Sequence, residues 1–402
     1  MRIICYVKNF LKFQKSDILK LSLTYYCLFL LIFAFPMIIA GCSDSDEEKK
    51  ETDPNSKTVV KLGAILPETG DLAKYGKTSR AAIELAIKEI NNKQGNTNLY
   101  FECVFEDDAM SPAKGVSAAQ KLITVDKVAA IIGPMGSTVT QAVAPIVERA
   151  GIVLLSPGST EPGITDIGQF IFRNCLSDKY EGSEMSSFVF NDLGLKKVGV
   201  YHINNAFGLG ISEVFINNFR DKGGEIVLVE AFMEKCRDHR TALAKLKSVA
   251  PEGIYIIGYD EMISVFRQGK ELGFKTQWLA TSFLNDQYLV DQMGNDADGT
   301  VLAAWVYDPN SPDPRIQNFA EVVRKQTGGL EPDVFSANSY DAVYLIYQAV
   351  KLQGPTSSEI QKGLLDIKDY NGVTGKTTFA QNGDVKKGLD FKKIKNGKLQ
   401  PL

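Results

Sequence analysis

Residues 130–162 hold two apolar strands that each end in a loop of small, hydroxyl-bearing residues, and no other stretch constrains the fold as strongly. The sequence there reads AIIGPMGSTVTQAVAPIVERAGIVLLSPGSTEP. The apolar runs at 128–132 and 152–155 are typical of strands buried on both faces, and residues 138–150 carry apolar side chains at helical spacing. A strand, a helix and a second strand in this order indicate a parallel sheet covered by helices.

The two loops are the first candidate for a binding site, because ligands of open α/β sheets lie beyond the carboxyl ends of the strands. Ser137 and Thr138 occupy the point where a helix begins, and Ser159 and Thr160 close the second loop. Free backbone N–H groups and the positive end of a helix dipole favour a small anion such as a carboxylate. The alternative is that these hydroxyls only cap helices and turns.

Strands and helices alternate along the rest of the chain, which predicts an α/β fold with doubly wound parallel sheets. The alternation starts afresh after Asp178, which indicates a second lobe of the same architecture. A loop is predicted at 67–76, a helix begins at Thr78, and the tail from Gly372 is expected to form a hairpin from strands 377–379 and 388–394. Further strands are predicted at 59–66, 100–106, 170–173, 198–201, 226–232, 254–257, 277–281 and 301–307, and further helices at 112–125, 179–193, 208–221, 241–249, 261–272, 315–326, 335–352 and 358–365.

Length and composition exclude several classes of function. The chain of 402 residues is long enough for two domains, and its net charge of -3 without a basic patch argues against nucleic acid as a partner. Its two histidines, His202 and His239, fit no metal-ligand spacing, and no cofactor motif is present. A hydrolase acting through Ser137 or Ser159 is the enzyme alternative, but it lacks a plausible base. We therefore expect no enzyme, no metal and no cofactor.

The amino terminus indicates export. Residues 1–20 are basic overall, and the uncharged apolar run 21–41 ends in small residues directly before Cys42. This pattern is similar to a bacterial lipobox, which predicts a signal peptide at 1–41, lipidation of Cys42 and a flexible polar tether at 42–57. The alternative is an uncleaved transmembrane anchor. The remaining Cys103, Cys175 and Cys236 are expected to be free thiols.

The order of the motifs resembles one family. A strand that ends in a loop containing Tyr75-Gly76 is followed by Asp107-Asp108, then IIGPMGSTVTQAVAPI and LLSPGSTEP, and later by Arg173 with Ser177-Asp178, NNAFGLG and an IIGY strand end. From about residue 58 to the C-terminus, the chain resembles the substrate-binding proteins of ABC importers of the leucine/isoleucine/valine-binding type, which are type I periplasmic binding proteins.

The resemblance implies two α/β lobes joined by a three-segment hinge, with the ligand in the cleft between them. The implied lobes are 58–176 plus 301–377 and 177–300 plus 378–402. It also implies an extracytoplasmic receptor, periplasmic or on the cell surface and lipid-anchored to the membrane, that binds a small carboxylate-bearing ligand by hinge closure and delivers it to ABC permease and ATPase subunits. A ligand-sensing module of a signalling system is the alternative.

The family pattern also implies the ligand-binding residues. In amino-acid-binding members, hydroxyls and backbone groups of the two loops hold the ligand carboxylate, and aromatic side chains line the cleft. The matching loop residues here are Ser137, Gly158, Ser159 and Thr160, and the matching aromatic residues are Tyr75, Phe207, Tyr259 and Phe335.

One position departs from the family. Ser282 stands where branched-chain binders carry the Glu that pairs with the ligand's ammonium group. A buried ammonium without an anion is costly, so another acid must supply the charge, with Asp260 the first candidate and Asp286 the second, or the ligand is a non-amino-acid carboxylate or an amide. We expect a small carboxylate-bearing ligand, specifically an amino acid, and make no prediction about branched-chain specificity.

Overall fold

The computed structural model describes residues 57–93 and 98–402, and these belong to one compact unit that runs from Asn55 to Leu402. The predicted signal peptide, Cys42 and the tether up to residue 56 lie outside the described residues. Within those ranges, no helix has both the length and the apolar character needed to cross a membrane.

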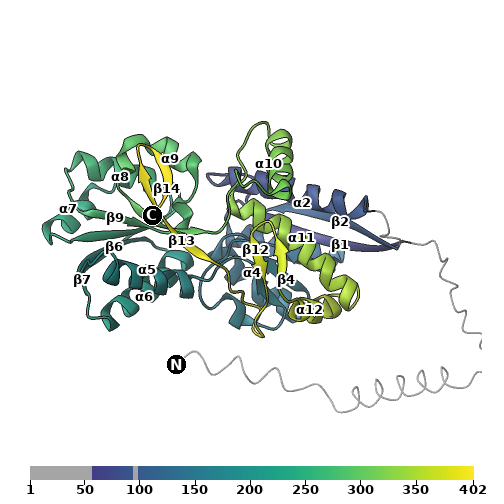
Figure 1. The fold of residues 1–402 in the computed structure, drawn as a ribbon. Coiled ribbons are helices and arrows are strands. Elements are labelled where there is room, and N and C mark those ends of the chain that lie inside the picture. The colour runs from purple at the N-terminus through teal and green to yellow at the C-terminus, as the bar shows by residue number, and fades with distance from the viewer. Residues whose placement is uncertain (1–56, 94–97) are drawn as a thin grey trace, which may run out of the picture. The chain divides into compact units, whose positions relative to one another are not determined.

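The first sheet has five parallel strands in the order β2-β1-β3-β4-β5. Figure 1 labels β1, β2 and β4 of this sheet. Side chains of β1 point alternately to two separate apolar cores: Leu62 and Ala64 pack on one face, and Ile65 packs on the other. Burial on both faces explains the continuous apolar runs of these strands. The strands are β1 (Thr58–Leu66), β2 (Leu99–Asp107), β3 (Ala130–Ile132), β4 (Val153–Ser156) and β5 (Ile171–Arg173).

Helices cover both faces of this sheet, and together with it they form what we call the first lobe. One core is shared with α11, which packs against α2 and α12, and the other core is shared with α3 and α4. The helices are α2 (Ala73–Asn91), α3 (Pro112–Lys121) with the π-helical turn η1 (Leu122–Asp126), α4 (Ser137–Ala150), the short η2 (Ile164–Ile167), α10 (Pro314–Gln326), α11 (Val334–Leu352) and α12 (Ser357–Asp366).

The second sheet has seven strands in the order β14-β13-β10-β9-β8-β6-β7, and with its helices it forms the second lobe around one large core. Strands β6 to β10 run parallel, whereas the C-terminal β13 and β14 are antiparallel. The strands are β6 (Lys197–Ile203), β7 (Glu225–Phe232), β8 (Gly253–Ile257), β9 (Gln277–Ala280), β10 (Val301–Trp305), β13 (Leu389–Lys395) and β14 (Lys398–Pro401). The helices are α5 (Asp178–Asn191), α6 (Ala206–Asp221), α7 (Arg240–Ser248), α8 (Met262–Glu271), η3 (Ser282–Leu284), α9 (Gln287–Met293) and η4 (Gly294–Ala297).

The predicted α/β architecture is confirmed, but the predicted lobe boundaries are wrong at two crossings. Residues 301–377 are predicted to lie in the first lobe, but Val301 of β10 pairs with Leu279 of β9, because this fully buried strand extends the second sheet. Residues 378–402 are predicted to lie in the second lobe, but Phe379 and Val385 pack in the first lobe's core. The chain therefore crosses between the lobes after β10 and again just before β13.

The predicted C-terminal hairpin is also wrong. The structure has two hairpins instead, one between β11 (Tyr370–Gly372) and β12 (Gly375–Thr377) and one between β13 and β14. Asn396 and Gly397 connect β13 to β14 with φ angles of 53° and 66°. An Asn-Gly pair with positive φ is the strongest short-range hairpin signal, and the sequence carries it at this point.

Helix α2 begins earlier than predicted, at Ala73 and not at Thr78, so that Tyr75 lies in its first turn and not in a loop. Gly76 permits this arrangement: a Cβ atom there would lie 2.2 Å from the carbonyl oxygen of Pro67. The glycine therefore serves a close approach of the helix to the end of β1, and not a flexible turn.

Three segments connect the lobes, and they meet around one small cavity. Leu176, Trp305 and Lys387, one from each connection, line about 230 Å³ of space there. Lys387 donates hydrogen bonds to Asn338 Oδ1 (3.1 Å) and Thr374 Oγ1 (2.6 Å), and burial lowers the pKa of its amino group to about 8. The hinge is thus built from three neighbouring segments.

Candidate functional site

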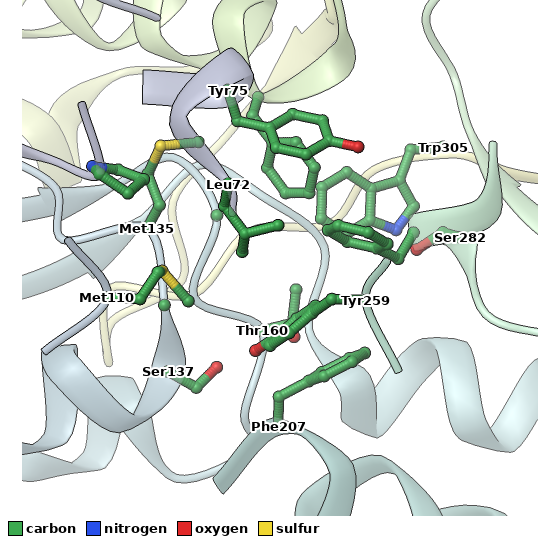
Figure 2. Close-up of a pocket in the computed structure, with 15 residues that line it drawn as sticks. Leu72, Tyr75, Met110, Met135, Ser137, Thr160, Phe207, Tyr259, Ser282 and Trp305 are labelled. Carbon is green, nitrogen blue, oxygen red and sulfur yellow. The ribbon is translucent and has the colours of Figure 1, made fainter. Parts of the chain in front are cut away.

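A pocket of about 530 Å³ lies where the carboxyl ends of strands from both sheets meet (Figure 2). This is the position at which α/β sheets bind ligands, since each strand ends there and is followed by a loop or by the first turn of a helix. From the first lobe it is lined by Pro67, Leu72, Tyr75, Met110, Met135, Gly136, Ser137, Gly158, Thr160 and Phe335, and from the second by Phe207, Tyr259, Ser282, Phe283 and Trp305.

The polar part of the pocket comes from the loops after β3 and β4. Ser137 is the first residue of α4, where backbone N–H groups have no partner within the helix. Its Oγ accepts a hydrogen bond from the N–H of Glu161 (3.3 Å), and its hydroxyl faces the pocket in Figure 2. The neighbouring Gly158 has no side chain because a Cβ atom would lie 3.0 Å from the ring of Phe335. This wall can therefore offer N–H and O–H donors to an anion.

Most of the remaining lining is aromatic or thioether. The rings of Phe207 and Tyr259 stack with centroids 5.4 Å apart. Tyr75 and Trp305 each contact Phe335 edge-on, with centroids 5.4 and 5.6 Å apart. In Figure 2 the sulfur-bearing side chains of Met110 and Met135 lie across the pocket from Trp305. An apolar ligand group of moderate size fits such a lining, because Met side chains adapt to irregular shapes.

The loop that carries Thr160 is held by Arg173, the largest fully buried side chain of the described residues. The guanidinium donates to the carbonyl oxygens of Thr160 (3.0 Å) and Glu161 (2.7 Å). It also binds both carboxylate oxygens of Asp384 at 2.9 and 3.0 Å. A planar guanidinium with bidentate hydrogen bonds holds its partners in a defined geometry. Arg173 therefore fixes the backbone of the loop so that Thr160 faces the pocket.

Two buried carboxylates from the first turn of α5 lie against this wall. Thr160 Oγ1 donates to Asp178 Oδ2 (2.8 Å), and Asp178 Oδ1 has no hydrogen-bond partner among the described residues. Glu181 accepts from the N–H of Ser282 (2.8 Å), its hydroxyl (2.6 Å) and the indole N–H of Trp305 (2.9 Å). Burial raises the pKa of both acids, and for Asp178 the neighbouring Glu181 adds to the effect.

Three polar contacts join the lobes beside the pocket. Lys74 forms an ion pair with Asp286, whose carboxylate also accepts a hydrogen bond from the Tyr75 hydroxyl (3.0 Å). On the other side, Thr138 Oγ1 accepts from the N–H of Ala206 (3.2 Å). The pocket is therefore bridged by direct contacts between residues of the two lobes.

The structure brings together all the predicted binding residues except Ser159 and Asp260. The Ser159 hydroxyl is fully buried and bonds to Thr140 Oγ1 (2.6 Å) and to backbone carbonyls. Asp260 forms an ion pair with Arg237 (2.9 Å) and lines a neighbouring cavity. Its expected role as ammonium partner is thus at odds with its placement, and the second candidate, Asp286, is paired with Lys74.

Sequence reasoning missed several lining residues, namely Pro67, Leu72, Met110, Met135, Gly136, Phe283 and Trp305. Each lies at, or within six residues of, the carboxyl end of a strand. Taking every residue after a predicted strand end as a candidate would have found most of them. The predicted helix-start position of Phe335 is correct. In the part of the chain that the structure describes, no group of His, Cys, Asp or Glu could hold a metal ion.

Comparison with known proteins gives an independent line of evidence about the family of this chain. A family model described as "Periplasmic binding protein" matches residues 59–398. The Leu/Ile/Val-binding protein homolog 1 of Brucella suis is 29% identical over 332 residues, which cover 81% of this chain and 88% of that protein. A leucine-, isoleucine-, valine-, threonine- and alanine-binding protein of Pseudomonas aeruginosa is 27% identical and covers 83% of this chain and 88% of its own length.

Solved structures agree in fold. A leucine-binding protein from Thermotoga maritima superposes with a TM-score of 0.77 at 29% identity and covers 85% of this chain and 97% of its own. The branched-chain amino acid transporter substrate-binding protein of Streptococcus pneumoniae, solved in complex with isoleucine, gives the same TM-score and identity and covers 85% and 98%.

Proposed function

The chain belongs to the periplasmic binding protein family, and on that premise we propose that it is the extracytoplasmic receptor of an ABC amino-acid importer. The proposed ligand is an α-amino acid with an apolar side chain. Relatives named for leucine, isoleucine and valine binding, and a structural relative solved with isoleucine, support this class of ligand.

One observation carries the proposal. Ser137 brings a hydroxyl and the first turn of α4 into a pocket whose other walls are mostly aromatic rings and Met side chains. A helix start with free N–H groups suits a carboxylate, and the apolar walls suit a hydrocarbon or thioether side chain. An amino acid with an apolar side chain carries both of these groups, the carboxylate and the apolar side chain, in one small molecule.

The mechanism is capture between two lobes. A ligand that contacts Ser137 of the first lobe and Tyr259 of the second binds most tightly when the lobes are closed, and so it shifts the open–closed equilibrium toward that form. The hinge of three neighbouring segments permits this motion. The closed form is then the one that the permease recognises. The family consists of solute-binding proteins, and we propose that no chemical step takes place in this pocket.

Tethering at Cys42 completes the proposed function. A lipid on Cys42 keeps the receptor at the membrane that holds the permease. Cys42→Ala should therefore abolish incorporation of labelled palmitate, with Cys103→Ala as the control that keeps it. Labelling that persists in Cys42→Ala would contradict the lipidation site.

The ligand class is tested by thermal shift and calorimetry on the full-length protein in mild detergent. Leucine, valine, methionine and phenylalanine should raise the unfolding midpoint by mass action. Glutamate, arginine and leucinamide should not, because the pocket offers no charged partner for their extra groups and leucinamide lacks the carboxylate. Stabilisation by amides or amine-free acids alone would replace the amino-acid proposal. A sensor with the same ligand would instead be recognised by unchanged uptake in a deletion strain.

A further inference from the structure

We propose that Asp178 supplies the negative charge that pairs with the ligand's ammonium group, in place of the acid that Ser282 replaces. The inference rests on the proposed function, since it presupposes an amino-acid ligand. It goes further by assigning the amine end of the ligand to one wall of the pocket.

Three other acids near the pocket are already engaged. Asp260 is paired with Arg237 and Asp286 with Lys74. Glu181 accepts three hydrogen bonds, from two groups of Ser282 and from the Trp305 indole. Because its acceptor sites point at these donors, Glu181 holds the pocket wall in place and has little capacity for a ligand.

Asp178 differs from all three. Its side chain is 1% exposed, and its Oδ1 has no hydrogen-bond partner among the described residues. It is not the helix cap either, because Ser177 occupies the N-cap position and accepts the N–H of Lys179. The nearby guanidinium of Arg173 is bound to Asp384 and to backbone carbonyls. A buried carboxylate with a free acceptor and no paired cation is costly unless a cation arrives.

Thr160 connects this carboxylate to the ligand. Its hydroxyl proton points at Asp178 Oδ2 (2.8 Å), so the lone pairs of Thr160 Oγ1 remain available to the pocket. An oxygen that presents lone pairs accepts N–H donors and does not donate to a carboxylate. An ammonium group that donates to Thr160 Oγ1 would therefore be separated from the Asp178 carboxylate only by the Thr160 hydroxyl group. The ligand carboxylate is then left to Ser137 and the first turn of α4.

The test compares two ligands that differ only in the amine. Full-length wild type and Asp178→Asn are titrated calorimetrically with L-leucine and with 4-methylpentanoate, which has the same skeleton without the amine. Wild type should prefer leucine by more than a hundredfold. Asp178→Asn should bind leucine at least thirtyfold more weakly, while its affinity for 4-methylpentanoate stays within threefold of wild type. Asp260→Asn, the matched control, should behave as wild type toward both.

Each outcome has one reading. If wild type binds no amino acid, the proposed function fails and this inference fails with it. If wild type binds leucine but Asp178→Asn retains the full preference for it, or loses both ligands equally, the assignment of Asp178 is overturned while the proposed function stands. Thermal unfolding is recorded for every variant. Should Asp178→Asn not fold, Asp178→Ser, which keeps a small polar group behind Thr160, takes its place in the same comparison.

Discussion

Lys74 and Asp286 join the two lobes through an ion pair in which each side chain is only 10% exposed. Lys74 lies in the first turn of α2, and Asp286 caps α9 by accepting the N–H of Tyr288 (2.9 Å). The ammonium group of Lys74 also lies over the ring of Tyr288, 4.6 Å from its centroid. An ion pair so shielded from water is screened less than a surface pair, so this contact favours the form in which the lobes touch.

Removing this pair should weaken ligand binding without unfolding either lobe. For Lys74→Met we expect a loss of about 1–2 kcal/mol, or roughly five- to thirtyfold in affinity, because the closed form loses a charge-assisted contact that the open form lacks. Calorimetric titration with leucine measures it. Lys245→Met, which breaks the exposed pair with Glu230 inside the second lobe, is the control. Equal affinities in the two variants would show that the Lys74 pair does not act on closure.

The two serines of the candidate loops should respond differently to the same change. Ser137→Ala removes a hydroxyl that faces the pocket and should weaken leucine about tenfold or more, since a hydrogen bond to a charged group contributes about 1.5–3 kcal/mol. Ser159→Ala removes a hydroxyl bonded to Thr140 and backbone carbonyls, so it should lower the unfolding midpoint and leave affinity unchanged. The reverse pattern would place the carboxylate at Ser159.

Arg173 should matter to both stability and binding. Asp384→Ala leaves the fully buried guanidinium without its carboxylate, and we expect the free energy of unfolding to fall by about 3 kcal/mol. Because Arg173 also holds the carbonyls of Thr160 and Glu161, ligand affinity should fall in the fraction that stays folded. Urea unfolding and titration measure the two effects. Asp166→Ala, a change at a nearby exposed acid, serves as control, and a matching loss there would refute the assignment.

Asp108 should make stability depend on pH in a definite direction. It is fully buried, its Oδ1 accepts the N–H of Met110 (2.8 Å), and burial raises its pKa to about 6. A raised carboxyl pKa means that the folded form holds its proton more tightly than the unfolded chain. The resulting stability is fully present below the unfolded pKa of about 4 and is lost as pH rises through about 6.

Asp108→Asn removes this dependence because the amide stays neutral. Relative to wild type, the variant should gain on the order of 2 kcal/mol in the free energy of unfolding between pH 4 and pH 7. Urea unfolding at both pH values gives the difference. Asp192→Asn, at an exposed position, should follow wild type. If Asp108→Asn also follows wild type, the carboxyl is not the titrating group.

The fold was predictable to the extent that local patterns determine it. Apolar runs such as 152–155 become buried strands wherever helices cover both faces, and the alternation of strand and helix fixes a parallel sheet. Membership of a sheet is not local. β10 could have followed either lobe from its own sequence, and only its pairing with β9 and β13 assigns it to the second.

The site was predictable where it follows from strand ends, as for Ser137, Thr160 and Tyr259. Two residues that were predicted to line the pocket do not line it, because each side chain is directed toward a hydrogen-bonding or charged partner elsewhere. Ser159 turns to Thr140, and Asp260 turns to Arg237, both partners distant in sequence. The unpaired Oδ1 atom of Asp178 could not be predicted from the sequence either. It depends on Ser177 being the N-cap residue of α5, and on Thr160 donating to only one of the two carboxylate oxygens.

The late strands of the second sheet have a consequence for the order of folding during synthesis. Strand β10 gains its second neighbour only when β13 has been made, and the first lobe's core is completed by Phe379, which also lies near the C-terminus. Domains usually fold one after another as the chain leaves the ribosome. Here the first lobe's core includes Phe379 and the second lobe's core includes Ile394, so neither lobe can complete its core until most of the other has been made.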